Sequence, residues 1–260
     1  MKTKLNIDGD AVLKEALDRI SHAGKVSQPA RRDFLRRTLT LGGLSMLTGC
    51  ALVDEESVDT ALTRISRFND DVQGWLFDPN RMAPTYPDSM IQRPFPFNAF
   101  YDEEEIPVVE DNSFRLEVTG LVADKRKWSL AELRAMPQID QVTRLICVEG
   151  WSAIGKWGGV SFASFLRRVG ADLSAKYVGF KCADDYYTSI DMPTALHAQT
   201  LLALTYDGQT LPPKYGFPMK LRMPTKLGYK NPKHIQAIFV TNTYPGGYWE
   251  DQGYNWFGGS

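Results

Sequence analysis

The chain has 260 residues, of which 43% are hydrophobic and 12% aromatic, and its formal net charge at pH 7 is -1. This length and apolar content suit one large domain with a sizeable core and an N-terminal extension. The near-neutral charge argues against a nucleic-acid-binding protein, which needs a basic surface to neutralise phosphates. With three cysteines and no CxxC pair, the sequence also excludes a disulfide scaffold and a zinc knuckle.

The N-terminal region carries the features of an export signal. Residues 31–35 (RRDFL) precede a modestly apolar stretch, 38–49 (TLTLGGLSMLTG), which is shorter than the roughly 20 apolar residues of a membrane-spanning helix. The arrangement resembles a twin-arginine signal, and residues 47–50 (LTGC) resemble a lipobox. We therefore expect residues 1–49 to be a signal segment and Cys50 to carry a lipid anchor.

Residues 50–96 form a second segment of mixed composition. One short amphipathic stretch, Val58–Phe68, is followed by Pro, Asp and Asn residues, which are typical of turns and loops. We expect this segment to be a tether that wraps against the main domain. The main domain is then expected to occupy residues 97–260.

Within the main domain, apolar runs of strand length recur between turn signals. The helix signals lie at Ser129–Ala135, where Ser129 and Glu132 have the spacing of a capping box, and at Ser161–Val169. Because the strands and helices alternate irregularly, the pattern favours an α+β fold with mixed sheets. No glycine-rich nucleotide motif opens a helix. Examples of these apolar runs are Phe114–Val118, Gln141–Val148, Tyr177–Cys182, Met219–Met223 and Ile235–Thr241, and an irregular tail is expected over Tyr244–Ser260.

Residues 144–152 (RLICVEGWS) are the most informative segment for chemistry. Cys147 ends an apolar strand and is followed by polar and glycine residues, so we expect its sulfur to emerge at a sheet edge. Soft thiolates bind redox metals, and the cations of Arg144 or Lys156 are expected to favour the thiolate. Simple packing of a buried cysteine is the alternative that these residues leave open.

The CVEGWS and KWGGV segments resemble the cofactor-cysteine segment of molybdopterin oxidoreductases of the sulfite oxidase class. The resemblance is closest to the group of periplasmic methionine-sulfoxide reductase catalytic subunits. Further matches follow in chain order: 98–102 (NAFYD) is similar to the NxFY[DE] loop, 201–218 to the LLAYxxNGxxLPxxxGxPxR signature, and 226–233 (KLGYKNPK) to the segment that holds the pterin phosphate. Together the matches cover roughly residues 97–241.

This resemblance implies a single sulfite-oxidase-type domain with a molybdenum-molybdopterin cofactor, for which Cys147 is the metal ligand. Tyr186 aligns with a tyrosine near the metal in sulfite oxidases, so Tyr186 is the second catalytic candidate beside Cys147. The alternative is that Tyr186 is a strand residue packed in the core. A tyrosine hydroxyl can donate a hydrogen bond to a substrate oxygen in a dry pocket. The residues assigned to cofactor binding are Asn98, Tyr101, Asp102, Cys147, Cys182, Tyr215, Lys220, Lys226, Lys230, Asn231 and Lys233.

Some of these residues also have simpler interpretations. Segment 226–233 suits phosphate because its lysines supply point charges and Gly228 allows a close backbone approach, but it is also typical of a solvated basic loop. Asn98 alone is typical of a turn and Tyr101 of a core. The acidic run that begins at Asp102 is otherwise a solvated face.

Two positions depart from the class signature. Tyr215 replaces a His or Asn, and Lys220 replaces an Arg, with Arg222 two residues further on. Lysine cannot reproduce the two-pronged contact of a guanidinium group, so the details of pterin contact differ. Of the histidines, His197 is expected to be structural, and His234 to face the cofactor phosphate.

The class resemblance implies oxygen-atom transfer coupled to two electrons. Sulfite oxidases follow the ligand cysteine with a CxGNR-type segment, whereas Glu149, Gly150 and Trp151 stand here. Only about 20 residues follow the matched region, too few for the C-terminal dimerisation domain of sulfite oxidases. These differences favour a monomeric enzyme that reduces an S-oxide such as methionine sulfoxide.

The electrons must then come from a separate protein, since the chain has no CxxCH haem motif. A membrane cytochrome or a quinol-linked partner suits an enzyme held on the periplasmic side. The twin-arginine route carries folded proteins, which suits a chain that acquires its cofactor before export. The alternatives are a sulfite-type dehydrogenase that passes electrons to a cytochrome, and a cofactor-free binding lipoprotein, which would not need the thiol of Cys147.

Overall fold

The structure is a computed structural model that describes residues 55–260. The twin-arginine segment, the lipobox and Cys50 lie outside the described residues. Asp59–Ser260 form a compact unit, so residues 59–96 and the expected main domain belong to one body. Within the described part of the chain, every helix is too short or too polar to span a bilayer.

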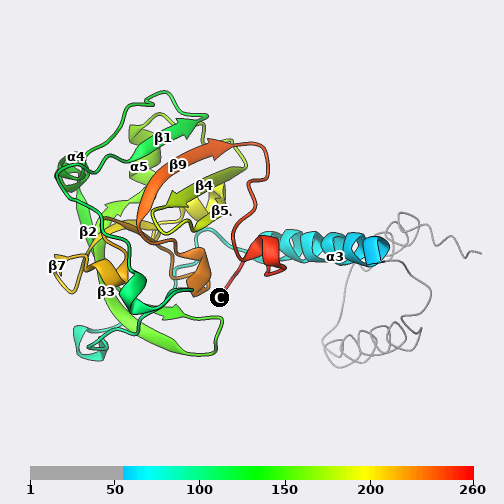
Figure 1. Cartoon of the computed structure of the whole chain (residues 1–260), viewed down its shortest axis with the longest axis horizontal. Coiled ribbons are helices and arrows are strands. Elements are labelled where there is room, and N and C mark those ends of the chain that lie inside the picture. The colour runs from blue at the N-terminus through cyan, green and yellow to red at the C-terminus, as the bar shows by residue number, and fades with distance from the viewer. Residues whose placement is uncertain (1–54) are drawn as a thin grey trace, which may run out of the picture. The chain divides into compact units, whose positions relative to one another are not determined.

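The first sheet has four strands in the order β1-β9-β4-β5. These strands are β1 (Glu117–Gly120), β9 (Ile235–Thr241), β4 (Tyr177–Cys182) and β5 (Tyr187–Asp191). β1 runs parallel to β9, whereas β9 with β4 and β4 with β5 are antiparallel (Figure 1). The sheet is mixed, as the irregular sequence pattern predicted.

The second sheet is antiparallel throughout and carries the Cys147 segment at one edge strand. Its strands are β2 (Gln138–Ile146), β3 (Ser152–Ser161), β6 (Leu201–Tyr206), β7 (Gln209–Thr210) and β8 (Lys220–Arg222). β2, β3, β6 and β7 follow one another in this order, and β8 pairs with β6 on the same edge as β7. β2 and β3 form a long hairpin with full register from Gln138 to Ile146.

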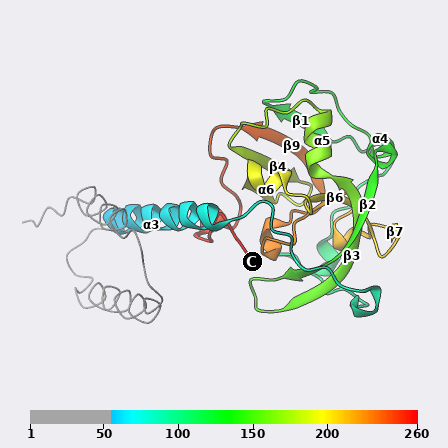
Figure 2. The ribbon, with the colours of Figure 1, turned by 180° about the vertical axis from the view of Figure 1, so that it is seen from behind.

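Three short helices cover the sheets: α4 (Leu130–Ala135), α5 (Phe162–Arg168) and α6 (Met192–Leu196). α5 contacts β3 and α6, and α6 also contacts β4 and β5 (Figure 2). The predicted capping box of α4 is confirmed: the Glu132 amide donates to Ser129 Oγ across 3.3 Å, and the Ser129 amide donates to Glu132 Oε2 across 2.9 Å.

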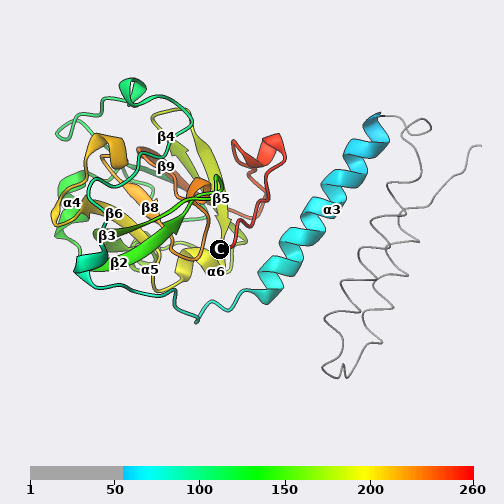
Figure 3. The ribbon, with the colours of Figure 1, turned by 90° about the horizontal axis from the view of Figure 1, so that it is seen from below.

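A long helix precedes these elements, and short 3-10 turns connect them. The long helix is α3, Glu55–Leu76, drawn in cyan in Figure 3. It extends the amphipathic stretch expected at 58–68 by three residues at the start and by eight at the end. The 3-10 turns are η1 (Asp88–Met90), η2 (Glu103–Glu105), η3 (Pro213–Tyr215), η4 (Gly228–Lys230) and η5 (Glu250–Gln252).

The segment between α3 and the first sheet lies along the hairpin of β2 and β3. Thr85 forms a bridge with Thr143, and the Gln92 amide donates to the Ile154 carbonyl across 2.9 Å. Phe95 enters a buried cluster that includes Trp157, to which its ring lies edge-on at 5.2 Å between centroids. The path of this segment places the loop that follows it, 98–102, next to the end of β2.

The core consists of two clusters. The larger cluster joins the mixed sheet to α4 and α5 and includes Phe162, Phe165 and Phe180, all fully buried. The smaller cluster lies against the antiparallel sheet around Trp157 and Tyr215. Of the predicted functional residues, Cys147 directly follows β2 and Lys220 begins β8. Cys182 and Tyr186 belong to the larger cluster, and Tyr215 belongs to the smaller one.

Candidate functional site

Cys147 lies directly after β2, in the tight turn that leads into β3. The Gly150 amide donates to the Cys147 carbonyl across 3.2 Å, and the Cys147 amide donates to the Trp151 carbonyl across 2.9 Å. Gly150 has a φ of 91°, which lies in the left-handed region that favours glycine. This glycine lets the turn close and places the thiol at the end of the strand.

Two side chains contact the sulfur of Cys147. Asn98 Nδ2 donates a hydrogen bond to the sulfur across 3.4 Å, and the thiol lies 3.6 Å from Glu149 Oε2. The same Glu149 oxygen accepts a hydrogen bond from Trp151 Nε1 across 2.9 Å, which fixes the carboxylate. Burial raises the pKa of Cys147, and the charge of Glu149 raises it further.

The expectation that Arg144 or Lys156 favours a Cys147 thiolate is wrong. The pKa of Cys147 is raised, and Arg144 is directed to another side chain, the ring of Tyr86. Its guanidinium carbon lies 6.0 Å from the centroid of the Tyr86 ring. Lys156 Nζ instead pairs with Asp88 across 3.3 Å. A metal that takes Cys147 as ligand must therefore displace the thiol proton itself.

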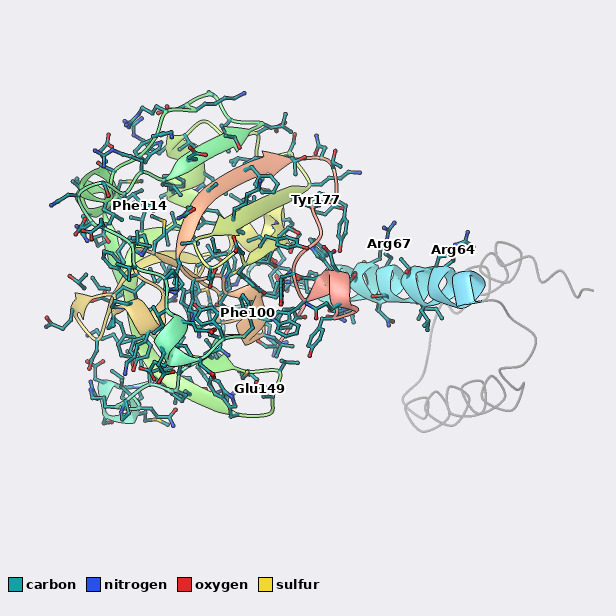
Figure 4. All side chains as sticks on the ribbon, in the orientation of Figure 1. Arg64, Arg67, Phe100, Phe114, Glu149 and Tyr177 are labelled. Atoms are coloured by element: carbon teal, nitrogen blue, oxygen red, sulfur yellow. The ribbon has the colours of Figure 1, made fainter. Side chains whose placement is uncertain are left out.

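A cavity of about 120 Å³ opens beside Cys147, and residues from five parts of the chain line it. Figure 4 labels two of them, Phe100 from the loop before η2 and Glu149 from the turn between β2 and β3. The lining thus combines carboxylates, aromatic rings and one lysine. The lining residues are Asn98, Ala99, Phe100, Cys147, Val148, Glu149, Asp184, Tyr186, Gly228, Tyr229, Asn231, Pro232, Lys233, Trp249 and Tyr254.

Tyr186, the second catalytic candidate, lines this cavity, but its hydroxyl has a partner in the protein. The hydroxyl donates to the Tyr229 carbonyl across 2.6 Å. Burial raises the pKa of Tyr186 well above its usual range. In this arrangement Tyr186 holds the 228–230 turn against the cavity and keeps its proton.

Asp184 is a cavity residue that the sequence analysis missed. Its carboxylate accepts a hydrogen bond from the Tyr101 hydroxyl across 3.0 Å and one from the Tyr186 amide across 3.3 Å. Burial raises the pKa of Asp184. The available signal was the Asp184-Asp185 pair just before Tyr186, which is also typical of a turn between two strands.

Lys220 and Lys233 lie together at the base of the site, on either side of Gly216. A side-chain carbon placed on Gly216 would lie 2.9 Å from Lys233 Cβ and 3.2 Å from Lys220 Cβ. Lys233 Nζ is buried without a hydrogen-bond partner among the described residues, and so is His234 Nε2. Lys220 is 2% exposed, and its Nζ lies 5.1 Å from the centroid of the Trp157 ring.

Within the described part of the chain, neither Lys220 nor Lys233 forms an ion pair with a carboxylate. Burial lowers the pKa of Lys233 to about 8, and burial and the Lys233 charge lower the pKa of Lys220. Burial also lowers the pKa of His234 to about 4. Uncompensated buried charge is costly, so the cluster is suited to an anionic group. A thiol beside two such lysines fits a metal cofactor that carries a phosphate.

Lys226 and Lys230, expected to bind the same phosphate, point elsewhere. Lys226 Nζ donates to the Phe257 carbonyl across 2.8 Å, and Lys230 Nζ donates to the Ser189 carbonyl across 2.7 Å. Lys230 also forms a buried ion pair with Glu250. Neither lysine lines the Cys147 cavity. Both side chains tie the 226–230 segment to the C-terminal tail and to β5.

Three further predicted residues do not line the cavity. The Tyr215 hydroxyl donates to the Phe95 carbonyl and accepts from the Phe95 amide, each across 3.0 Å, so its polar atom is fully used. Cys182 is buried in the larger core cluster. Asp102 is exposed, as expected of the acidic run at 102–105.

Asn231 lines the cavity, and its amide group holds the loop after β8. Its Oδ1 accepts from the Met223 amide across 2.7 Å, and its Nδ2 donates to the Leu227 carbonyl across 2.9 Å. Arg222 also donates to the same Oδ1 and, across 2.7 Å, to the Arg144 carbonyl, so it clamps β8 to β2.

His197 has the structural role that was predicted. Its Nε2 contacts the Arg81 carbonyl across 3.1 Å, and its Nδ1 accepts from the Gln199 amide across 3.1 Å.

Comparison with known proteins agrees with this combination of fold and thiol-centred site. Residues 103–249 match the family model described as the oxidoreductase molybdopterin binding domain. The chain belongs to this family, and it is a molybdenum-dependent oxidoreductase whose cofactor is molybdenum-molybdopterin.

Individual relatives extend the comparison. An Azospira oryzae protein with the provisional name protein-methionine-sulfoxide reductase subunit YedZ1 is 72% identical over 254 residues, which covers 97% of this chain and 96% of that protein. The protein-methionine-sulfoxide reductase catalytic subunit MsrP of Ralstonia nicotianae is 29% identical over 67% of this chain and 61% of its own length. The fold is similar to the sulfane dehydrogenase SoxCD of Paracoccus pantotrophus, with a TM-score of 0.50 and 17% identity over 53% of this chain and 40% of that chain.

Proposed function

We propose that the chain is the catalytic subunit of an exported enzyme that reduces the sulfoxide of methionine, with electrons from a separate membrane redox partner. The relatives named above are called protein-methionine-sulfoxide reductase subunits, which supports this substrate class. The sulfite-type dehydrogenase is the competing function. The composition of the cavity beside Cys147 favours the reductase.

The observation that carries this proposal is the charge of that cavity. The carboxylates of Glu149 and Asp184 line it, and Glu149 stands where sulfite oxidases place a segment with an arginine. Sulfite is an anion, so the carboxylate of Glu149 repels it. Lys233, the one lysine of the lining, is suited to the anionic part of the cofactor and does not compensate for this repulsion. A sulfoxide is neutral, so it does not meet this penalty.

The lining of the cavity also suits an apolar side chain. Val148, Phe100 and Tyr254 line it and are 48%, 37% and 38% exposed, so they form an accessible rim. The methylene and methyl groups of methionine sulfoxide are apolar, and its unbranched side chain is flexible enough to enter an irregular pocket. A methionine sulfoxide on an accessible polypeptide segment therefore fits this rim.

Within the site, we assign Cys147 as the ligand to molybdenum and Asn98 as the residue that orients its sulfur. Lys220 and Lys233 hold the anionic part of the pterin, with Asn231 shaping the loop beside it. When bound, the cofactor supplies two-electron chemistry with exchange of an oxygen atom. The other predicted residues have the positions described above. They are Tyr101, Asp102, Cys182, Tyr215, Lys226 and Lys230.

Sulfoxide reduction takes up two electrons and two protons, breaks the S–O bond and releases the oxygen as water. Asp184 is suited to deliver a proton, because burial raises its pKa and Tyr101 fixes its orientation. Tyr186 keeps the cavity wall in place through its bond to the Tyr229 carbonyl. The electrons enter through the cofactor from the redox partner.

The placement of the enzyme follows from the sequence. The twin-arginine pattern and the lipobox support a lipid-anchored protein on the periplasmic side. The name of the Azospira oryzae relative as a subunit supports a separate partner, for which a membrane cytochrome or a quinol-linked protein is suited. A folded export route allows the cofactor to be inserted before the chain crosses the membrane.

Paired assays with the cofactor-loaded protein test the proposed direction. Reduction of a methionine-sulfoxide peptide by an artificial electron donor is compared with sulfite-dependent reduction of an artificial acceptor, and Cys147→Ser is the inactive control. We expect peptide reduction to exceed sulfite oxidation by at least about 100-fold in kcat/KM, which corresponds to 2.7 kcal/mol. Faster sulfite oxidation would reverse the assignment.

A further inference from the structure

Helix α3 is attached to the body of the domain through its polar face. Asp70 Oδ1 accepts hydrogen bonds from Asn255 Nδ2 across 2.7 Å and from the Phe257 amide across 2.9 Å. One turn earlier, the guanidinium carbon of Arg67 lies 5.6 Å from the centroid of the Tyr244 ring. These contacts fix the helix to the C-terminal tail from a single side.

The opposite side of α3 carries an exposed apolar row, which we call the outer stripe. Its members recur three or four residues apart, so they lie on one helix face. At 100° per residue, the centre of this row lies roughly 180° from the direction of Arg67 and Asp70. The outer stripe consists of Leu62 (57% exposed), Ile65 (58%), Phe68 (39%), Val72 (36%), Trp75 (82%) and Leu76 (67%).

This orientation is the reverse of that in an ordinary surface helix. A surface helix of a globular domain packs its apolar stripe on the core and turns its polar face to water. Here the polar face is bound, whereas the apolar face stays largely exposed beside the described residues. Several adjacent exposed apolar side chains mark an interaction site, because solvated proteins seldom leave such rows uncovered.

The position of α3 in the chain indicates what covers the outer stripe. Glu55, the first residue of α3, is five positions after Cys50, the proposed lipid-bearing cysteine. Five extended residues span at most about 18 Å. Acyl chains on Cys50 therefore bring the start of α3 to the surface of the bilayer.

The charges of α3 indicate the kind of surface. Glu55, Glu56, Asp59, Asp70 and Asp71 outnumber the two basic residues, which are Arg64 and Arg67. The helix therefore gains no net attraction to anionic lipids, and its binding energy must come from apolar burial. It is also too polar to cross a membrane, so it would lie along the interface.

We propose that α3 lies in the interface of a lipid bilayer, with the outer stripe in the apolar layer and the polar face holding the domain above it. The helix would thus be a second membrane contact beside the lipid anchor, and it would set the orientation of the domain. The choice of a bilayer rests on the proposed anchor at Cys50. The binding of the stripe itself is testable without any acyl chain.

The experiment uses residues 51–260, which contain the whole compact unit but neither the signal stretch nor the lipid site. Flotation with phosphatidylcholine vesicles compares the parent protein with Ile65→Gln and with Thr63→Gln. Ile65 lies in the outer stripe, whereas Thr63 is an exposed residue of the same helix outside it. Circular dichroism checks that both variants keep their helix content.

We expect the parent and Thr63→Gln to float with the vesicles and Ile65→Gln to partition about tenfold more weakly. Binding should be independent of salt and should not increase with anionic lipid. Brominated lipids should quench the tryptophan fluorescence of the parent more than that of Trp75→Phe, because Trp75 is the most exposed residue of the stripe.

Failure of the parent to float, or equal partitioning of the two variants, would overturn the proposal. A stripe-dependent dimer in sedimentation without vesicle binding would also overturn it, because the occupant would then be a second copy. Mass spectrometry of the native protein tests acylation of Cys50 separately, so failure of the anchor is distinguishable from failure of the stripe.

Discussion

Asn98 donates its side-chain amide to the sulfur of Cys147 across 3.4 Å, although the two residues are 49 positions apart in the chain. The loop that carries Asn98 reaches the sulfur because the preceding segment is fixed along β2 and β3. Fully buried Trp157 packs against Phe95 in that segment. The geometry of the proposed metal ligand therefore depends on packing on the opposite side of the hairpin.

Loss of this hydrogen bond should reduce turnover without loss of metal. In Asn98→Ala, the sulfur keeps its place in the turn but loses the donor that orients it, so we expect kcat to fall about tenfold with unchanged molybdenum content. Steady-state kinetics and elemental analysis of the same sample provide the check. Asn112→Ala, at an exposed position, is the matched control. Unchanged kcat in Asn98→Ala would contradict an orienting role.

Removal of the Lys233 charge should weaken retention of the cofactor. Its Nζ is buried without a hydrogen-bond partner among the described residues, and we assign it to the anionic part of the pterin. In Lys233→Met we expect the pterin content of the purified protein to fall severalfold, measured by the fluorescence of the oxidised pterin. Lys214→Met, at a partly exposed lysine on η3 that does not line the cavity, should leave the content unchanged. Equal pterin contents in the parent and Lys233→Met would contradict the assignment of Lys233 to the cofactor site.

The same substitution should change how stability depends on pH in the cofactor-free protein. Burial lowers the pKa of Lys233 to about 8, whereas a lysine in the unfolded chain titrates near 10.4. Between these values the unfolded state holds a proton that the folded state has released, so the Lys233 contribution to stability increases with pH.

We therefore expect Lys233→Met to be more stable than the parent at pH 7, by about 2 kcal/mol, and to lose this advantage as the pH approaches 10. Denaturant unfolding of both proteins at pH 7, 8.5 and 10 gives the difference directly. A difference that stays constant over this range would show that Lys233 is not the titrating group.

Gly216 should be needed for the arrangement of the two lysines. It has a φ of 119°, and a side-chain carbon there would lie 2.9 Å from Lys233 Cβ. Gly208→Ala is the matched control, since Gly208 has a φ of 77° but nothing within 4 Å of such a carbon. Both variants should lose about 1 kcal/mol of stability from backbone strain, and Gly216→Ala should lose more because its side-chain carbon overlaps Lys233. Only Gly216→Ala should also lose pterin, and equal pterin contents would contradict this prediction.

The capping box of α4 gives a prediction that concerns stability alone. Removal of the Ser129 hydroxyl leaves the Glu132 amide without its side-chain partner, so Ser129→Ala should cost about 1 kcal/mol of unfolding free energy. Thermal unfolding measures this loss. Ser164→Ala, at an exposed position inside α5, should have almost no effect. Similar losses in the two variants would show that the cap contributes nothing specific.

The sequence predicted the elements whose pattern is local. β4 and β9 have the predicted bounds, and α4 begins at the predicted cap. β3 was missed because its segment contains three glycines and a lysine, which are poor strand formers. Its extended form comes from pairing along all of β2, a contact between distant residues that local pattern does not reveal.

In the candidate site, too, features that depend on local sequence could be predicted, and those that depend on contacts between distant residues could not. The turn geometry of Cys147 could be predicted from the polar and glycine residues after a buried strand. The internal partners of Lys226 and Lys230 could not, because both lysines bond to carbonyl groups that are distant in sequence. Asp184 was missed for a similar reason, since its importance depends on burial beside Tyr101.

The most direct test of this account is the molybdenum content of purified protein from a host that makes the cofactor, compared between the parent and Cys147→Ser. Elemental mass spectrometry should give about one molybdenum per chain in the parent. The variant should lose the metal or show an altered spectrum, because its hydroxyl replaces the thiolate ligand. Molybdenum at the same level and with the same spectrum in both proteins, or none in the parent, would contradict the assignment of Cys147 as the metal ligand.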